Sequence, residues 1–127
     1  MGFQTAEDSH RGEEMVRKER YEEKEKLRGG EGIVRYYHVL TEEELNGHGR
    51  MFAKLVLPPG ASIGWHQHVG ETEPYYILKG EADFTDNDGT VTHVVPGDCC
   101  LIEVGQSHSI ANNGDEDVEF MALIYNE

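Results

Sequence analysis

Residues 60–80 read GASIGWHQHVGETEPYYILKG, and this stretch decides the fold. His66 and His68 lie two positions apart in an extended run, so both imidazoles project from one face of a strand, about 6.6 Å apart along the backbone. After a turn at Gly70 the chain returns, and Glu73 on the returning strand can face the same point. Two imidazoles and a carboxylate from one hairpin form a facial set that leaves coordination positions open on a metal ion. A His-x-His pair also occurs as an ordinary surface feature, so the pair alone does not establish a metal site.

A second stretch downstream, residues 97–112 (GDCCLIEVGQSHSIAN), has a spacing of its own. The first stretch runs Gly60, five residues, His66, one residue, His68, four residues, Glu73, six residues and Gly80. The second runs Gly97, five residues, Glu103, one residue, Gly105, two residues, His108, three residues and Asn112. Together they resemble the two signature motifs of the cupin superfamily, and the chain is similar to small single-domain members with a cupin type-2 barrel. One position departs from the pattern: Glu103 stands where the family has proline, before a turn.

The resemblance implies that four side chains hold one divalent metal ion inside the barrel: His66, His68, Glu73 and His108. Glu71 is the nearest competitor for Glu73, but its spacing fits the motif less well. Cupins similar to this chain commonly hold manganese or iron. Three imidazoles and one carboxylate also suit zinc, nickel, cobalt or copper, so the ligand set does not choose the metal.

The chain from Ile33 onward consists of short apolar runs separated by turn residues, which predicts an all-β domain. The cupin resemblance makes this domain an antiparallel double-stranded β-helix, the jelly-roll or cupin barrel. Nine strands are expected, over residues 33–39, 51–57, 63–68, 73–78, 82–85, 91–95, 99–104, 108–112 and 118–124.

Charge divides the chain into two parts. Residues 1–32 carry nine acidic and seven basic side chains and form a short charged N-terminal arm, whereas residues 33–127 carry sixteen acidic side chains and four basic ones and form the cupin β-barrel domain. Opposite charges at helical spacing within residues 13–27 predict a short solvated helix or a segment docked on another surface. The unpaired edges of a small sandwich favour a homodimer, with the arm crossing to the partner's sheet.

The composition narrows the range of partners and compartments. The formal net charge is −14, with 25 acidic against 11 basic residues, which disfavours nucleic acid and anionic membrane surfaces as partners. Cys99 and Cys100 are adjacent, and no apolar leader is visible, so a cytoplasmic location is expected. Because residues 33–127 contain only Arg35, Arg50, Lys54 and Lys79 as cations, substrates with several carboxylates or phosphates, oxalate among them, are disfavoured.

The expected function is that of a metal-binding cupin acting on a small oxygen-rich molecule, as a dioxygenase, decarboxylase or isomerase. Two alternatives stay open: the protein is a sensor or carrier that binds a small-molecule ligand without turnover, or it is a structural domain that the metal only stabilises. Tyr75 lies on the same strand face as Glu73, and it either donates a proton or only lines the wall of the cavity. Ile77, Phe84 and Ile110, with a residue from the range 120–124, are expected to line the cavity.

Overall fold

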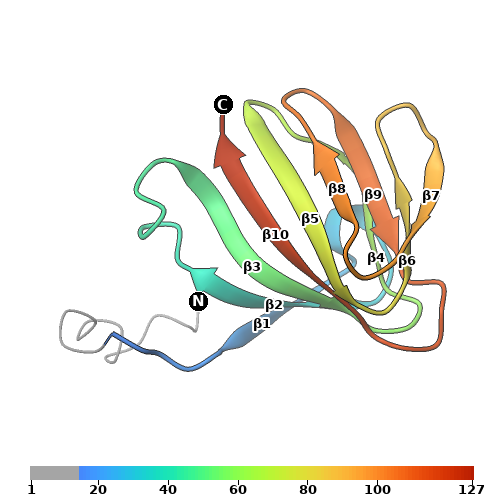
Figure 1. Cartoon of the computed structure of the whole chain (residues 1–127), viewed down its shortest axis with the longest axis horizontal. Helices are drawn as coiled ribbons and strands as arrows, with labels where there is room; N and C mark the ends of the chain where they lie inside the picture. The colour runs from blue at the N-terminus through green and yellow to red at the C-terminus, as the bar shows by residue number, and fades with distance from the viewer. Residues whose placement is uncertain (1–14) are drawn as a thin grey trace.

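The computed structural model describes residues 15–127, which form two antiparallel sheets facing each other (Figure 1). The six-stranded sheet has the order β1 (Tyr21–Glu25), β2 (Ile33–Leu40), β3 (Gly49–Leu57), β10 (Val118–Asn126), β5 (Glu71–Lys79) and β8 (Cys99–Ile102). The four-stranded sheet has the order β4 (Ser62–Gln67), β9 (Ser107–Ala111), β6 (Ala82–Thr85) and β7 (Val91–Val94). Within residues 15–127 there is one short 3-10 turn, η1 (Leu27–Gly29), and no α-helix. The predicted all-β double-stranded β-helix is confirmed.

All nine strands expected from the sequence are present, with ends that differ by a few residues at most. Their alternation places one face of each sheet in the core, as a half-buried strand requires. Across β10 and β3, for example, Phe120 lies opposite Leu55 and Ala122 lies opposite Ala53, and all four are fully or almost fully buried. No helix within residues 15–127 is long and apolar enough to cross a membrane.

The segment before residue 33 differs from the expectation. Residues 13 and 14 of the expected helix lie outside the described residues, and Tyr21–Glu25 is strand β1 instead of helix. β1 pairs with β2 along its whole length, so it extends the six-stranded sheet by one edge strand. Cross-strand contacts replace the expected helical charge pairs: Tyr21 packs on Tyr37 with ring centroids 5.1 Å apart, and Arg35 pairs with Glu23 at 3.3 Å. Pairing with a neighbouring strand therefore outweighed local helix support.

η1 fixes this segment against β4 in the other sheet. The Ser62 amide donates to the Glu31 carbonyl at 2.8 Å, and the Glu31 amide donates to the Ser62 hydroxyl at 2.9 Å. The backbones approach so closely that a Cβ on Gly30 would lie 2.2 Å from the Ser62 carbonyl oxygen, and one on Gly64 would lie 2.1 Å from the Arg28 carbonyl oxygen. Only glycine fits these two positions, and the segment is therefore built into the barrel.

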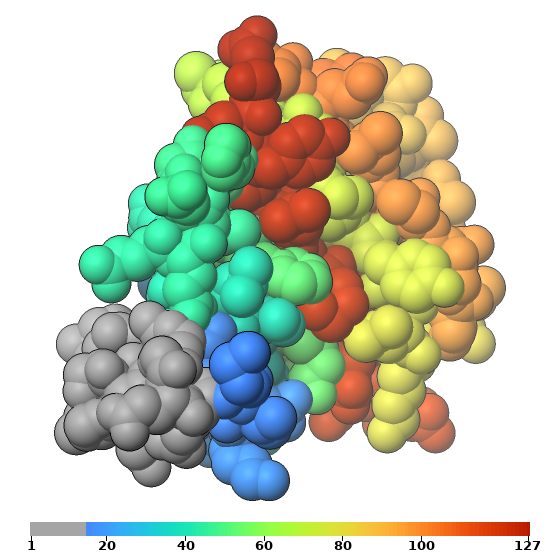
Figure 2. Space-filling view, turned by 60° about the vertical axis from the view of Figure 1, so that its left-hand side comes forward, coloured from blue at the N-terminus to red at the C-terminus, as the bar shows by residue number. Residues whose placement is uncertain are grey.

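The outer face of the six-stranded sheet is partly apolar. Figure 2 views the molecule from this side, with β3, β10, β5 and β8 lying next to one another. Tyr76 and Leu78 of β5 are 50% and 42% exposed, and Leu101 of β8 is 51% exposed. The adjacent strands β5 and β8 thus expose large apolar side chains on the outer face of the sheet.

Candidate metal centre and cavity

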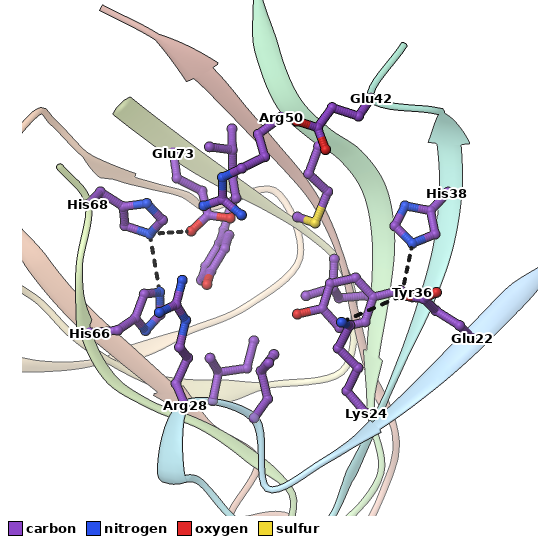
Figure 3. Close-up of a pocket in the computed structure, with 16 residues that line it drawn as sticks. Glu22, Lys24, Arg28, Tyr36, His38, Glu42, Arg50, His66, His68 and Glu73 are labelled. Carbon is purple, nitrogen blue, oxygen red and sulfur yellow. Dashed lines mark hydrogen bonds and ion pairs between the residues drawn. The ribbon is translucent and has the colours of Figure 1, made fainter. Parts of the chain in front are cut away.

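An open cavity of about 380 Å³ is lined by residues of both sheets and of η1 (Figure 3). One end is formed by His66, His68 and Glu73, and the other by Glu22, Lys24, Tyr36, His38 and Glu42. Apolar side chains complete the wall: Leu27, Met51, Leu55, Ile63 and Ile124. A volume of this size suits a small-molecule ligand.

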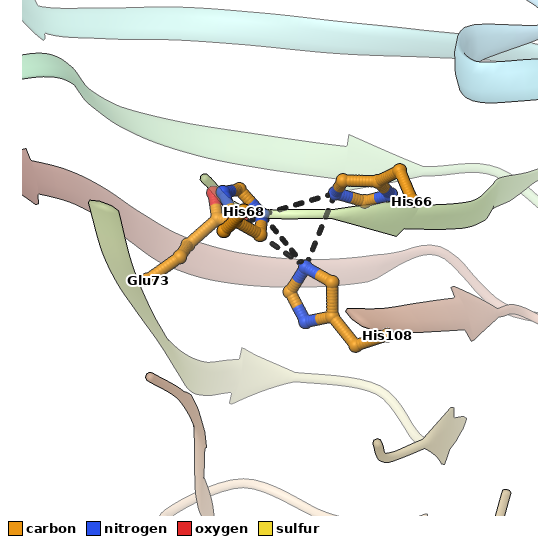
Figure 4. A group of neighbouring side chains, drawn as sticks. All are labelled: His66, His68, Glu73 and His108. Carbon is orange, nitrogen blue, oxygen red and sulfur yellow. Dashed lines mark hydrogen bonds and ion pairs between the residues drawn. The ribbon is translucent and has the colours of Figure 1, made fainter. Parts of the chain in front are cut away.

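The fold brings the four predicted metal ligands together at the first of these ends (Figure 4). His66 on β4 lies opposite His108 on β9 in the register of the four-stranded sheet, and His68 follows directly after β4. Glu73 comes from β5 in the other sheet. β4 and β5 therefore do not form the expected hairpin, because the connection between them crosses from one sheet to the other.

The donor atoms are spaced as ligands of a single ion. The Nε2 atoms of the three histidines lie 3.1 Å from one another, and Glu73 Oε1 lies 2.9 Å from His68 Nε2 and 3.1 Å from His108 Nε2. Ligands at right angles around an ion with bonds of about 2.1–2.2 Å are separated by about 3.0–3.1 Å, whereas tetrahedral ligands are separated by about 3.4 Å or more. The distances fit an octahedral arrangement better than a tetrahedral one.

The position of Glu73 relative to His66 completes this geometry. Among the described residues Glu73 forms no ion pair with His66, although the four donor atoms all lie within 4.8 Å of one another. Glu73 and His66 thus hold the most widely separated donors of the four, and an octahedral ion held by these four residues would keep two positions open to a ligand.

Hydrogen bonding supports the same donor set. The Nδ1 of His66 lies 2.7 Å from the Gly64 carbonyl oxygen, which requires the proton on Nδ1 and leaves the Nε2 lone pair pointing into the cluster. Glu73 Oε1 is buried without a hydrogen-bond partner among the described residues, despite the two imidazole nitrogens nearby. Three converging nitrogens and an unpartnered buried carboxylate oxygen are what a metal ion would satisfy. The residues present therefore fit a divalent metal.

A second carboxylate lies just outside the cluster. Glu71 receives two hydrogen bonds from Arg50, at 2.7 and 2.9 Å, and its Oε1 lies 3.6 Å from His68 Nδ1. Glu71 thus lies beside the cluster, and Glu73 is the carboxylate within it. The Arg50 guanidinium, through its hydrogen bonds, lowers the pKa of Glu71, so Glu71 is charged and faces the outer nitrogen of His68.

Burial sets the protonation of the cluster. Burial lowers the pKa of His66 to about 4, so this imidazole is neutral at physiological pH, as a metal ligand must be. Burial alone would raise the pKa of Glu73, but the contacts with His108 and His68 outweigh it and hold the pKa of Glu73 below its usual range. The cluster therefore presents a neutral imidazole at His66 and a carboxylate at Glu73.

Tyr75 lies beneath the cluster and is almost completely buried. Its ring stacks on His108 with centroids 5.0 Å apart and an interplanar angle of 24°, and it contacts Phe84 and Phe120. Burial, with the nearby charge of Glu73, raises the pKa of Tyr75 well above its ordinary value, so the phenol stays protonated. Ile124 lines the cavity as expected, whereas Ile77, Phe84 and Ile110 pack in the core and do not line it.

The cavity also contains residues that the sequence interpretation missed. Lys24 of β1 and Arg28 of η1 line it, together with Arg50 of β3. The count of cations in residues 33–127 omits the first two, so the expectation against ligands with several carboxylates loses its basis. The charge-rich composition of residues 17–28 was the available signal, but nothing local in that sequence places it beside residues 63–75.

Glu103, two further histidines and the two cysteines lie away from the cluster. Glu103, in the position of the family's proline, is exposed in a turn that Gln106 closes by hydrogen bonding to its backbone amide at 3.0 Å. His93 is exposed between Glu81 and Asp83, whereas His38 lines the far end of the cavity. Cys99 is exposed, Cys100 is buried, and neither forms a disulfide.

Comparison with known proteins gives consistent matches. The family described as "Cupin domain" matches residues 53–124. A protein of Thermotoga maritima named "Oxalate-binding protein" is 48% identical over 98 residues, covering 77% of this chain and 80% of that protein. A crystal structure of a predicted oxalate decarboxylase from Thermotoga maritima has a TM-score of 0.83 and 44% identity, covering 87% of this chain and 95% of that one. A cupin 2 conserved barrel domain protein from Salinispora arenicola has a TM-score of 0.63 and 25% identity, covering 73% of this chain and 76% of that one.

Proposed function

The chain belongs to the cupin family, and from its cavity we propose that it binds a small dicarboxylate of the oxalate class at a single divalent metal ion. The observation that carries the proposal is the convergence of the four donor atoms at one end of an open cavity. His66, His68, Glu73 and His108 would hold the ion, and the right-angle spacing of their donors favours manganese or iron over tetrahedral zinc. A bound ion supplies a Lewis acid that attracts and polarises a carboxylate.

The charges of the cavity support an anionic ligand. Three cations line the wall (Lys24, Arg28 and Arg50), and three carboxylates oppose them (Glu22, Glu42 and Glu73). These charges cancel, and Glu71, which is paired with Arg50, adds one negative charge, so a divalent ion would leave the site with a net charge of about +1, which attracts an anion. Names of the relatives point the same way: one is an oxalate-binding protein and another a predicted oxalate decarboxylase.

Tyr75 supplies a polar group at the metal end of the cavity. Its hydroxyl stays protonated, so Oη can donate a hydrogen bond to a ligand there and orient it. Met51, Leu55 and Ile63 cover the wall with apolar surface, which limits access of water to that end. We therefore keep decarboxylation of the bound acid as the second candidate function, supported by this hydroxyl and by the similarity to the predicted oxalate decarboxylase of Thermotoga maritima.

The experiment begins with the metal. Full-length protein stripped with chelator is reloaded with Mn(II), Fe(II) or Zn(II), and metal content is measured by elemental analysis. We expect about one ion per chain, lost in His108→Ala and retained in His93→Ala, which removes an exposed histidine remote from the cavity. Equal metal content in these two variants would refute the metal centre.

The ligand is tested on the same samples. Oxalate at about 100 times its dissociation constant is expected to stabilise the metal-loaded protein by about 2.7 kcal/mol, seen as a higher melting temperature, and to leave the stripped protein unchanged. Release of carbon dioxide and uptake of dioxygen are recorded in parallel. Stabilisation without either gas change assigns a binding protein. Carbon dioxide release without net dioxygen uptake assigns a decarboxylase, whereas release with dioxygen uptake assigns an oxidase. The absence of stabilisation by oxalate refutes the proposed ligand.

A further inference from the structure

The guanidinium of Arg28 lies at the mouth of the cavity. Arg28 is exposed, it lines the same cavity as His66, His68 and Glu73, and Figure 3 shows its side chain reaching toward the metal end beside His66. The two other cations of the wall have carboxylate partners: Arg50 is bound to Glu71, and Lys24 lies 3.7 Å from Glu22. Within residues 15–127 the Arg28 side chain has no hydrogen bond or ion pair. Its fork of donors is therefore available to a ligand.

The backbone that carries Arg28 is held in an uncommon conformation. Arg28 has φ 55° and ψ 31°, and Lys26, the residue that caps η1, has φ 51°. The backbone of both residues therefore lies in the left-handed region. Residues other than glycine adopt this region at a cost, and such positions persist where the surroundings fix them. Here the surroundings are the Lys26 amide bonded to the Gly32 carbonyl at 2.8 Å and the paired Glu31 and Ser62.

The same backbone contact joins Arg28 to the metal cluster. The Arg28 carbonyl packs against the Cα of Gly64, and the Gly64 carbonyl oxygen holds Nδ1 of His66 at 2.7 Å. One glycine thus sets the position of η1 on one side and the orientation of a metal ligand on the other. This packing places the backbone of Arg28 next to the strand that carries His66, so its side chain can reach the metal end of the cavity.

We propose that Arg28 recognises the second carboxylate of a dicarboxylate whose first carboxylate is held at the metal end, so that η1 selects dianions over monoanions. The inference rests on the proposed function. A planar guanidinium binds a carboxylate through two parallel N–H···O bonds, which gives both strength and orientation. A monocarboxylate gains nothing from Arg28 once its single carboxylate occupies the metal end.

Binding calorimetry on manganese-loaded, full-length protein tests this assignment with oxalate and acetate as probes. Arg28→Gln is expected to weaken oxalate binding about tenfold and to leave acetate binding within twofold of the original. Arg28→Lys retains the charge without the fork and is expected to fall between the two. Lys79→Gln is the matched control, because it removes one positive charge from an exposed residue outside the cavity and should bind oxalate like the original chain.

The outcomes separate this inference from the proposed function. If the original chain loaded with manganese does not bind oxalate, the proposed function fails and the role of Arg28 fails with it. If the original chain binds oxalate and Arg28→Gln binds it equally well, only the role of Arg28 is overturned. The same holds if Lys79→Gln loses as much affinity as Arg28→Gln, or if Arg28→Gln loses its metal.

Discussion

Gly30→Ala is the change that best tests whether η1 is built into the barrel. Gly30 has φ −75° and ψ −163°, which alanine adopts without strain, so the penalty is steric. The added Cβ would lie 2.2 Å from the Ser62 carbonyl oxygen, whereas ordinary contacts begin at 3.4 Å, so η1 and β4 must separate by about 1.2 Å. That movement breaks the two hydrogen bonds between Glu31 and Ser62.

The size of the effect follows from those contacts. Two lost hydrogen bonds cost about 1–3 kcal/mol, and misfit of a methyl group in a packed site costs a similar amount. Together these contributions are about 2–6 kcal/mol, so for a chain of 127 residues, at about 4 °C per kcal/mol, we expect the melting temperature to fall by about 8–24 °C. The separation should also expose Lys24, Lys26 and Arg28 to trypsin, because β1 is an edge strand held on one side only.

Gly114→Ala is the matched control. A Cβ there would meet its nearest neighbour, Asn112 Oδ1, at an ordinary 3.5 Å, so the melting temperature should change by less than about 2 °C. Scanning calorimetry and a trypsin time course are run on both variants. If Gly30→Ala melts and is cleaved like Gly114→Ala, the close approach of η1 and β4 is wrong.

Three further predictions concern other parts of the molecule. Hydrogen bonds that the His93 imidazole donates to Glu81 and Asp83 raise the pKa of His93, so their stabilisation is fully present below about pH 6.5 and is lost as the pH rises through the raised value. The melting-temperature difference between the unmodified chain and His93→Gln should therefore shrink from pH 6 to pH 9, and a difference independent of pH would contradict this prediction. Tyr75→Phe should retain metal and lose at least about 100-fold in any decarboxylation, whereas unchanged turnover would make Tyr75 wall only. We predict that the chain forms a homodimer through the apolar outer face of β5 and β8, with a mass of about 29 kDa (twice 14.3 kDa) by light scattering. Leu101→Glu should convert this dimer to a monomer. A monomeric unmodified chain at micromolar concentration would reject the prediction.

The strands and the metal ligands were predictable because both are encoded locally. Alternation and turn residues mark each strand of the range 33–124, and the ligand positions follow a spacing within two short stretches. The pairing of strands is not local. His68 and Glu73 are five positions apart, yet they reach one point from opposite sheets, and a hairpin would have satisfied the same spacing.

The conformation of the segment before Ile33 could not be predicted from its local sequence. Its alternating charges satisfy helical pairs as well as cross-strand pairs, so composition leaves the two conformations balanced. What decides is the edge of β2, which offers unpaired backbone groups that only a strand can use. Because the predicted domain boundary falls at residue 32, Lys24 and Arg28 were not expected to line the cavity. The division of the chain into arm and barrel stays a prediction.

The two halves of the proposed site rest on parts of the fold with different expected stability. The metal cluster joins β4, β9 and β5 across both sheets, and its side chains are mostly buried, so it should persist as long as the barrel is folded. Arg28 lies on a short turn after an edge strand, where local opening costs much less than global unfolding. Metal retention and ligand selectivity are therefore separable: a change at η1 should alter which anion binds while the ion stays in place. Removing the whole segment before Gly30 would delete β1 and Arg28 together, so substitutions at single positions distinguish a role in ligand binding from a role in dimer formation.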